Sequence, residues 1–203
     1  STRKAIELKP DFAEFHYNLG NILKKLGKLK EAELSQRKAI SIKPDFVESY
    51  IILGNILKGR GELKEAEICL KKALEYKPNS AEAHNNLGTI LKDLGKLREA
   101  EISIRKAIKI NPNHAECYNN LGTILKKADK LEEAESLISK ALNLNPKLAD
   151  AHLNLGNIFK DLGQLNKAEI STRKAIELKP TYAKAYYNLG NILKDLDKLN
   201  EAE

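Results

Sequence analysis

The sequence of 203 residues has little of what several kinds of functional site require. It has only two cysteines, Cys69 and Cys117, 5% aromatic residues and no run of 18 apolar residues. Without such a run we expect no membrane-spanning helix. The cysteines lack the spacing of a metal site, so we predict reduced, buried apolar side chains in a cytoplasmic protein, and a disulfide remains the alternative.

Catalytic and phosphate-binding motifs are also missing. The sequence contains no glycine-rich phosphate loop, no pair of neighbouring cysteines and no Ser-His-Asp arrangement, so we expect no enzymatic activity, no cofactor and no metal site. The net charge of +7 makes an acidic partner one alternative, although the lysines are interspersed with glutamates. Aromatic residues do not alternate with the lysines, so we predict no binding to nucleic acid.

A period of 34 residues organises the chain, because this interval separates all six prolines: Pro10, Pro44, Pro78, Pro112, Pro146 and Pro180. Position 1 of each repeat is defined as the third residue after the proline. Apolar residues recur at positions 4, 7, 10, 11 and 14 and again at 17, 20, 27, 28 and 30, which predicts two amphipathic helices per repeat. The repeats start near residues 13, 47, 81, 115 and 149, and a shortened one covers 183–203.

Turn residues separate the two predicted helices of each repeat. Four repeats have a glycine there, suited to a left-handed turn: Gly27, Gly61, Gly95 and Gly163. Asp129 and Asp197 take its place in the other two, which keeps the turn but weakens it. Each proline is expected to end the second helix.

The repeats resemble those of the tetratricopeptide repeat family over the whole chain. Leucine and glycine fill positions 7 and 8 in Leu19-Gly20, Leu53-Gly54, Leu87-Gly88, Leu121-Gly122, Leu155-Gly156 and Leu189-Gly190. Position 20 holds Ala32, Ala66, Ala100, Ala134, Ala168 and Ala202. Glycine at position 8 is expected where a neighbouring helix crosses, because a Cβ would hold the two backbones apart. The resemblance implies an all-α fold, a right-handed superhelical α-solenoid formed by a single array over residues 1–203.

Two positions depart from the family pattern. Position 4 alternates between histidine and tyrosine in place of tryptophan: His16, Tyr50, His84, Tyr118, His152 and Tyr186. Position 24, usually aromatic, holds Gln36, Leu70, Ile104, Ile138 and Thr172. The smaller residues at these two positions predict a core with less bulky side chains. The histidines lie two repeats apart, too far to share a metal ion, and we interpret them as packed imidazoles.

Residues 1–9 match the end of a second helix, and the last repeat is shortened. Because repeats of this type bury their faces against neighbours, we predict that the two ends complete one another by head-to-tail stacking of chains.

Polar residues recur on the face of each first helix opposite its packed stripe. Position 6 holds Asn18, Ile52, Asn86, Asn120, Asn154 and Asn188, and position 9 holds Asn21, Asn55, Thr89, Thr123, Asn157 and Asn191. Position 12 is always lysine: Lys24, Lys58, Lys92, Lys126, Lys160 and Lys194. We call the asparagines at positions 6 and 9 the asparagine row and the lysines the lysine row. In the family this face lines a concave groove.

Asparagine weakens a helix interior, so its recurrence on an exposed face needs a reason. One carboxamide can pair with the N–H and the C=O of one residue in an extended peptide. The row also resembles the superhelical repeat region of O-linked N-acetylglucosamine transferases, where asparagines hold the backbone of protein substrates. We predict that it binds an extended peptide. The alternative is that these residues are family consensus or form hydrogen bonds between helices.

The lysine row could attract acidic groups, or be solvated and partly neutralised by Asp93, Asp161 and Asp195. A clamp for a carboxylate terminus would need lysine at position 5, which instead holds Tyr17, Ile51, Asn85, Asn119, Leu153 and Tyr187. We predict that the tyrosines, Ile51 and Leu153 give apolar contacts in the groove.

On the second helix, position 22 holds Leu34, Ile68, Ile102 and Ile170, which we call the outer apolar row. We expect partial burial there, and lateral self-association is the alternative. The sequence as a whole predicts a protein-interaction module that binds a protein or peptide. The alternatives are an assembly module with lateral or end-to-end contacts, and a targeting arm of a larger transferase.

Overall fold

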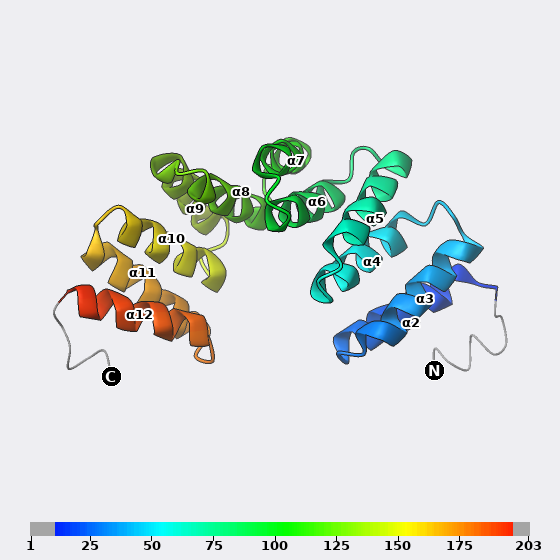
Figure 1. Ribbon diagram of the computed structural model, residues 1–203, viewed down its shortest axis with the longest axis horizontal. Helices are drawn as coiled ribbons and strands as arrows, with labels where there is room; N and C mark the ends of the chain where they lie inside the picture. Colours follow the sequence, from blue (N-terminus) through cyan, green and yellow to red (C-terminus); the bar gives the residue numbers. More distant parts are fainter. Residues whose placement is uncertain (1–10, 197–203) are drawn as a thin grey trace. The chain divides into compact units, whose positions relative to one another are not determined.

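The computed structural model describes residues 11–196, and within that range the chain is helical with no strand (Figure 1). The helices are α2 (Ala13–Lys25), α3 (Leu29–Ile42), α4 (Val47–Gly59), α5 (Leu63–Tyr76), α6 (Ala81–Asp93), α7 (Leu97–Ile110), α8 (Ala115–Lys127), α9 (Leu131–Leu144), α10 (Ala149–Asp161), α11 (Leu165–Leu178) and α12 (Ala183–Asp195). The all-α class and the two helices per repeat are confirmed. The predicted head-to-tail stacking involves residues 1–9 and the end of the last repeat. It falls on residues 1–10 and 197–203, which lie outside the described range.

The chain divides into two compact parts, residues 1–110 and residues 111–203. In the N-terminal part α2 pairs with α3, α4 with α5 and α6 with α7; in the C-terminal part α8 pairs with α9 and α10 with α11, and α12 packs on α11. Second helices also pack on the first helix of the following repeat, as α3 does on α4 and α9 on α10. This is the packing of a helical-repeat solenoid within each part.

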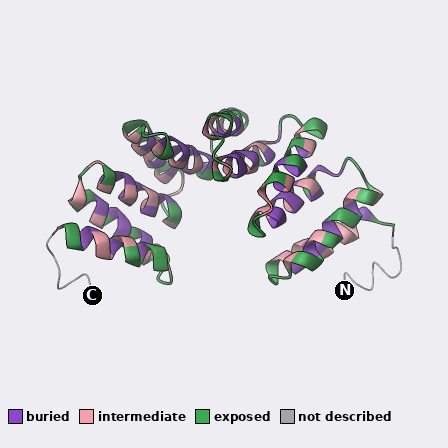
Figure 2. Ribbon diagram, in the orientation of Figure 1, coloured by how far each residue is buried: buried purple, intermediate pink, exposed green. Residues whose placement is uncertain are grey.

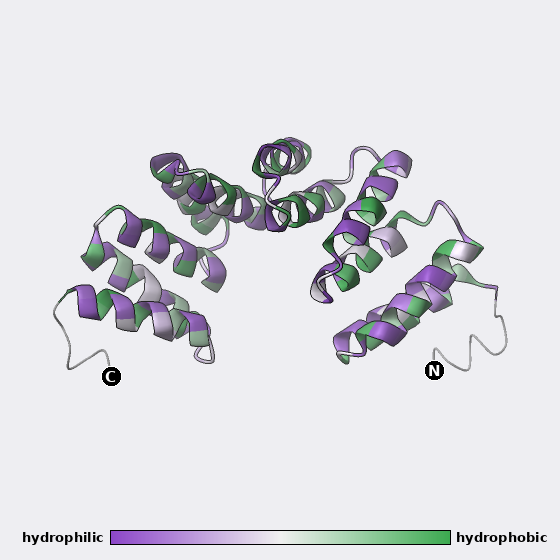
Figure 3. Cartoon of the chain, viewed as in Figure 1, coloured by the Kyte–Doolittle hydropathy of each residue, from purple (hydrophilic) through white to green (hydrophobic). Residues whose placement is uncertain are grey.

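Each part has its own apolar core, where the buried residues of neighbouring helices face one another (Figure 2). Every helix carries both hydrophobic and hydrophilic residues along its length, as expected for amphipathic helices (Figure 3). The largest fully buried side chains are Leu53, Ile56, Leu57, Leu70, Ile90 and Ile104 in the N-terminal part, and Leu121, Ile124, Leu125, Ile138, Leu153 and Ile158 in the C-terminal part.

The prolines end the second helices as predicted. Helix α3 stops at Ile42, and Lys43, directly before Pro44, has φ −128° and ψ 92°. A residue that precedes proline is pushed out of the helical region by the ring, so the chain becomes extended there. Lys77, Asn145 and Lys179 have nearly the same backbone angles before their own prolines.

Left-handed residues end the first helices. The φ angle is 75° at Gly27 and 59° at Asp129, which confirms that aspartate keeps the turn; Asp197 lies outside the described residues. Around Gly27, Gly27 N donates to Lys24 O (3.0 Å) and Lys28 N donates to Leu23 O (2.9 Å). This pair of bonds is the Schellman motif, which satisfies carbonyls that the helix end leaves free.

Glycine at position 8 marks the closest approach of the two helices within a repeat. A Cβ placed on Gly88 would lie 2.5 Å from Ile104 Cδ1 and 3.1 Å from the carbonyl oxygen of Ala100. The residue at position 24 fills this space in each described repeat and is fully buried: Gln36, Leu70, Ile104, Ile138 and Thr172. The predicted crossing is confirmed, and its partner is the second helix of the same repeat.

The outer apolar row is exposed and not partly buried, so the predicted burial was wrong. The exposed fractions are 68% for Leu34, 66% for Ile68, 58% for Ile102 and 69% for Ile170. Position 22 lies about 200° around the helix from the buried alanine at position 20, so neighbouring helices do not cover it.

The histidines at position 4 are half-buried, and two of them bond to the backbone. The Nε2 atom of His84 lies 3.0 Å from Pro78 O, and Nε2 of His152 lies 2.9 Å from Pro146 O. A carbonyl oxygen only accepts, so Nε2 carries the hydrogen in both rings. Burial lowers the pKa of His84, which keeps this imidazole neutral.

Substitution of Gly88 tests the close approach. We expect Gly88→Ala to lower the free energy of unfolding by about 1–3 kcal/mol, because the new methyl group overlaps Ile104 and the backbone of α7. The matched control is Gly59→Ala, since the nearest atom to a Cβ there is Leu29 Cδ1 at 3.7 Å. The control should be neutral or stabilise by up to about 1 kcal/mol. Urea unfolding followed by circular dichroism measures both, and equal losses would contradict the packing account.

The cost of the left-handed aspartate is measurable in a reciprocal pair. Asp129→Gly should raise the free energy of unfolding by about 1 kcal/mol, because glycine has no Cβ to clash at positive φ. Gly95→Asp should lower it by a similar amount, since Gly95 has φ 78° at the equivalent turn. A loss of stability in Asp129→Gly would show that the aspartate side chain stabilises its turn.

Candidate protein-interaction face

The first helices of successive repeats pack against one another within each part. Helix α4 contacts both α2 and α6 in the N-terminal part, and α10 contacts both α8 and α12 in the C-terminal part. Each part therefore brings three first helices side by side (Figure 1). On each helix, position 6 lies about 200° around the axis from the packed residue at position 4.

The asparagine row is accessible but not fully solvated. Asn18 is exposed, and the other asparagines at positions 6 and 9 are half-buried. Ile52 interrupts the row and packs against the core formed by Leu23 and Ile56. The row thus gives a half-buried carboxamide on most of these helices, where a hydrogen bond is less weakened by water than at a bare surface.

Two members of the row bond to asparagines of the preceding repeat. Asn154 Nδ2 donates to Asn119 Oδ1 at 3.0 Å, and Asn188 Nδ2 donates to Asn157 Oδ1 at 2.6 Å. Asn119 occupies position 5 and is buried, whereas Asn157 belongs to the row itself. Hydrogen bonds between helices, one of the alternatives for this row, therefore occur in the C-terminal part.

These bonds use only part of each carboxamide. The side chain has two N–H donors and one carbonyl oxygen, and each bond engages a single donor of Asn154 or Asn188. The threonines at position 9 instead donate to backbone carbonyls of their own helices. Thr89 Oγ1 donates to Asn86 O and Thr123 Oγ1 donates to Asn120 O, both at 2.8 Å, so their hydroxyl hydrogens stay within their own helices.

The lysine row is partly neutralised across repeats. A lysine at position 12 pairs with the aspartate at position 13 of the following repeat: Lys58 with Asp93 (3.4 Å), Lys126 with Asp161 (2.5 Å) and Lys160 with Asp195 (2.9 Å). Neutralisation by these aspartates was one of the two interpretations of the sequence. Exposed pairs of this kind contribute at most about 1 kcal/mol each. The aspartate that would pair with Lys24 is replaced by Gly59, which stands at position 13 of the next repeat.

Position 5 contributes less to this face than predicted. Ile51 is 4% exposed and Leu153 is 1% exposed, so neither can offer an apolar contact to a partner. Leu153 packs in a cluster with Ala175 and with Ala185 of the following repeat. Tyr17 is half-buried against Phe46, with ring centroids 5.2 Å apart, whereas Tyr187 is freely exposed, at 72%.

Sequence reasoning missed the pairing of Cys117 with His114, at the start of α8. His114 is half-buried, and its Nδ1 atom lies 2.9 Å from Cys117 Sγ. Such a pair could activate a nucleophile, but burial raises the pKa of the Cys117 thiol to about 12. The thiol therefore remains protonated and is a poor nucleophile. The spacing of three residues at a helix start was the only signal for this contact.

Both cysteines are free and buried, which confirms their prediction as reduced apolar residues. Burial also raises the pKa of Cys69, to about 11. Within residues 11–196, no three His, Cys, Asp or Glu side chains are grouped to hold a metal ion. In the same range, no helix combines the length and the apolar character that crossing a membrane requires.

Several solved structures share this fold. YrrB, described as a TPR protein with an unusual peptide-binding site, is 27% identical, with a TM-score of 0.65 over 91% of this chain and 95% of its own. The APC/C hetero-tetramer Cut9–Hcn1 gives a TM-score of 0.90 at 18% identity over 96% of this chain and 39% of the matched one. TTC0263, a TPR protein from Thermus thermophilus, gives 0.78 at 19% identity over 90% and 99%. The last two likenesses show the fold alone.

No protein of curated function matches the sequence. The family assignment rests on a family model that matches residues 3–203. From residue 3 to residue 203 the chain belongs to the tetratricopeptide repeat family described as the C-terminal domain of cilia and flagella-associated protein 70.

Proposed function

We propose that this chain is a protein-interaction module that binds an extended segment of a partner protein along the faces of its first helices. Tetratricopeptide repeat proteins generally mediate protein–protein interactions, and YrrB, with 27% identity over most of this chain, has a peptide-binding site. The observation that carries the proposal is the half-buried asparagine row, which repeats on adjacent first helices and in which the bonds of Asn154 and Asn188 each use a single donor.

The spacing of the row suits an extended peptide. Packed helices lie about 8–10 Å apart, and an extended chain advances about 3.3 Å per residue. One repeat therefore spans roughly three peptide residues. A carboxamide once per repeat can then hold the peptide backbone at every third residue, whatever its side chains are.

The hydrogen bonds between asparagines occupy one donor of each donating carboxamide, but they also support peptide binding by orienting it. Asn119 and Asn157 accept from the next repeat and so fix the orientation of the Asn154 and Asn188 carboxamides. A fixed carboxamide loses less side-chain entropy when a peptide binds. The carbonyl oxygens of Asn154 and Asn188 can accept from peptide N–H groups while both bonds persist.

The affinity should be modest and tolerant of sequence. One hydrogen bond contributes about 1 kcal/mol net, and ordering of the peptide offsets part of the sum. Three of the lysines are already paired with aspartates. We therefore do not propose that Lys58, Lys126 or Lys160 binds an acidic group of a partner. Lys24 and the exposed Lys194 are the members of the row best placed to attract a carboxylate.

Replacement of three asparagines tests the row. Peptides selected from a display library of random sequences, each about 9 residues long to cover roughly the three first helices of one part, serve as probes. Their affinity is measured by fluorescence anisotropy. The triple variant Asn120→Ala, Asn154→Ala and Asn188→Ala, all within the C-terminal part, should bind about 10–100-fold more weakly, as expected for the loss of several hydrogen bonds.

The matched control changes three exposed asparagines outside the first helices: Asn113, Asn143 and Asn166, each to alanine. This control should bind within about twofold of the unchanged chain, since surface substitutions away from a site are nearly neutral. If the row variant keeps its melting temperature and binds as tightly as the control, the asparagine row does not bind peptides.

A second candidate function is lateral assembly, and the exposed outer apolar row favours it. Leu34, Ile68 and Ile102 recur on the second helices of three consecutive repeats in the N-terminal part. Ile68→Glu should abolish any association that sedimentation velocity detects as concentration rises. An unchanged sedimentation coefficient at all concentrations in the original chain would exclude this candidate. Head-to-tail stacking and a role as a transferase arm remain predictions from the sequence.

A further inference from the structure

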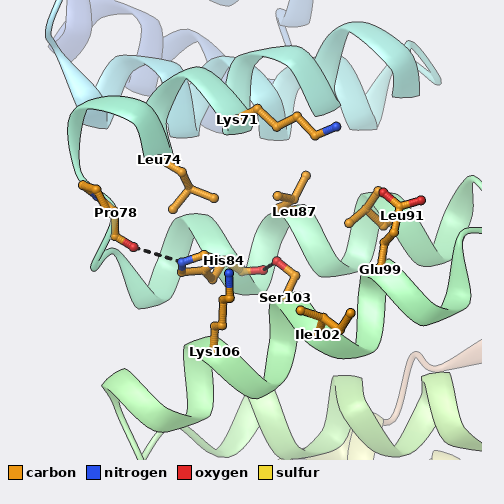
Figure 4. A pocket seen from close by; sticks show the side chains of 10 residues that line it. All are labelled: Lys71, Leu74, Pro78, His84, Leu87, Leu91, Glu99, Ile102, Ser103 and Lys106. Atoms are coloured by element: carbon orange, nitrogen blue, oxygen red, sulfur yellow. Dashed lines mark hydrogen bonds between the residues drawn. The ribbon is translucent and has the colours of Figure 1, made fainter.

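A pocket lies between α5, α6 and α7 in the N-terminal part, on the side of α6 opposite the asparagine row. Its volume is about 420 Å³, within the range of small-ligand sites. Leu74, Leu87, Leu91 and Ile102 line it with apolar surface, and Lys71, Lys106 and Glu99 also line it (Figure 4). His84, at position 4 of its repeat, lies at one end, bonded through Nε2 to Pro78 O.

The preceding repeat shows what fills the equivalent space there. One repeat earlier, Tyr50 stands in place of His84 and Tyr76 in place of Ile110. Their rings pack with centroids 6.0 Å apart, and Lys72 Nζ lies 5.3 Å from the centroid of the Tyr76 ring. An ion pair between Arg37 and Glu65 spans the same junction from α3 to α5.

These features are replaced at the pocket. His84 and Ile110 stand where the two aromatic rings would be, and Lys106 takes the place of Lys72. Lys71, the equivalent of Arg37, pairs with Glu67 on its own helix at 2.6 Å. The junction therefore lacks, among the described residues, an aromatic filling that the fold accommodates one repeat earlier.

The repeat that starts near residue 115 supports the same comparison. There the residue at position 4 is Tyr118, which is buried, and Lys140 Nζ lies 4.6 Å from the centroid of its ring. Lys140 is the equivalent of Lys106. Position 26 thus carries a lysine beside an aromatic ring in two repeats, and at the pocket the lysine is present where the sequence supplies no ring.

We propose that this pocket binds a tyrosine side chain of a partner segment whose flanking residues are acidic. The ring would lie on Leu87 and Leu91 beneath Lys106, which recreates the arrangement of Tyr50, Tyr76 and Lys72 and adds a cation–π contact. His84 Nδ1 is buried and has no hydrogen-bond partner within residues 11–196, so a phenol hydroxyl fits this wall better than a bare ring.

The charges around the pocket indicate which residues should flank the tyrosine in the partner segment. Lys106 and Lys109 line an adjoining hollow with Pro78, Asn79 and Ile110, and Lys71 lies on the other side. Of the described residues, Glu99 alone brings an acidic group to the lining of these two spaces. Carboxylates on both sides of the tyrosine can therefore pair with lysines, whereas basic flanking residues would be repelled.

The probe is the peptide acetyl-Asp-Glu-Tyr-Glu-Asp-amide, and the control peptide carries alanine in place of tyrosine. Binding to the whole chain is followed by ¹⁵N–¹H NMR shifts at up to about 5 mM peptide, because a single aromatic side chain gives weak affinity. The tyrosine peptide should shift the amides of His84, Ile102 and Lys106 saturably, and the alanine peptide should not.

Two matched variants decide whether the pocket is the site. His84→Tyr fills the space from within, as Tyr50 does one repeat earlier, and should weaken binding at least about tenfold while the fold survives. His152→Tyr makes the same substitution at position 4 of another repeat and should leave binding within about twofold. Lys106→Ala should weaken it about threefold through loss of the cation–π contact.

Several results would overturn this proposal. They are equal shifts with the alanine peptide, unchanged binding in His84→Tyr, absence of any saturable shift, and shifts confined to the asparagine row. None of them contradicts the proposed function, because the asparagine variants leave this pocket intact and the pocket variants leave the row intact.

Discussion

The close approach of two helices at one glycine per repeat is the constraint on which the rest of the structure depends. Where Gly88 or Gly122 lies, the second helix comes near enough for the position 24 side chain to fill the space that a Cβ would occupy. That contact sets the pairing within a repeat, and the pairing leaves position 6 of the first helix turned away from the core. The accessible asparagine row is thus a consequence of how the glycine is packed.

Much of this fold could be predicted from the sequence because the 34-residue period places each local signal in a fixed register. Proline after the second helix, glycine at the turn and glycine at position 8 each have one physical role, and Asp129 showed that a left-handed turn survives without glycine. Burial at position 22 was predicted wrongly because an apolar residue near a packed stripe was expected to be covered. Ile68 and Ile170 instead lie on the side of their helices that faces solvent.

The site was less predictable, because its details depend on side chains from two repeats at once. Periodicity located Asn154 and Asn188, but not their bonds to Asn119 and Asn157, which require the relative placement of two first helices. The same holds for Lys58 and Asp93, which meet only when successive repeats stack. The pocket at His84 arises from a combination of small replacements, each of which looks minor in the sequence alone.

A crystal structure of the chain with one of the selected peptides tests the central claim most directly, because it shows where the carboxamides bond. The account predicts an extended peptide across the first helices, with side-chain amides of the asparagine row about 2.7–3.2 Å from its backbone N–H and C=O groups. A peptide seated on the second helices, with Asn154 and Asn188 still bonded only to their neighbours, would contradict it.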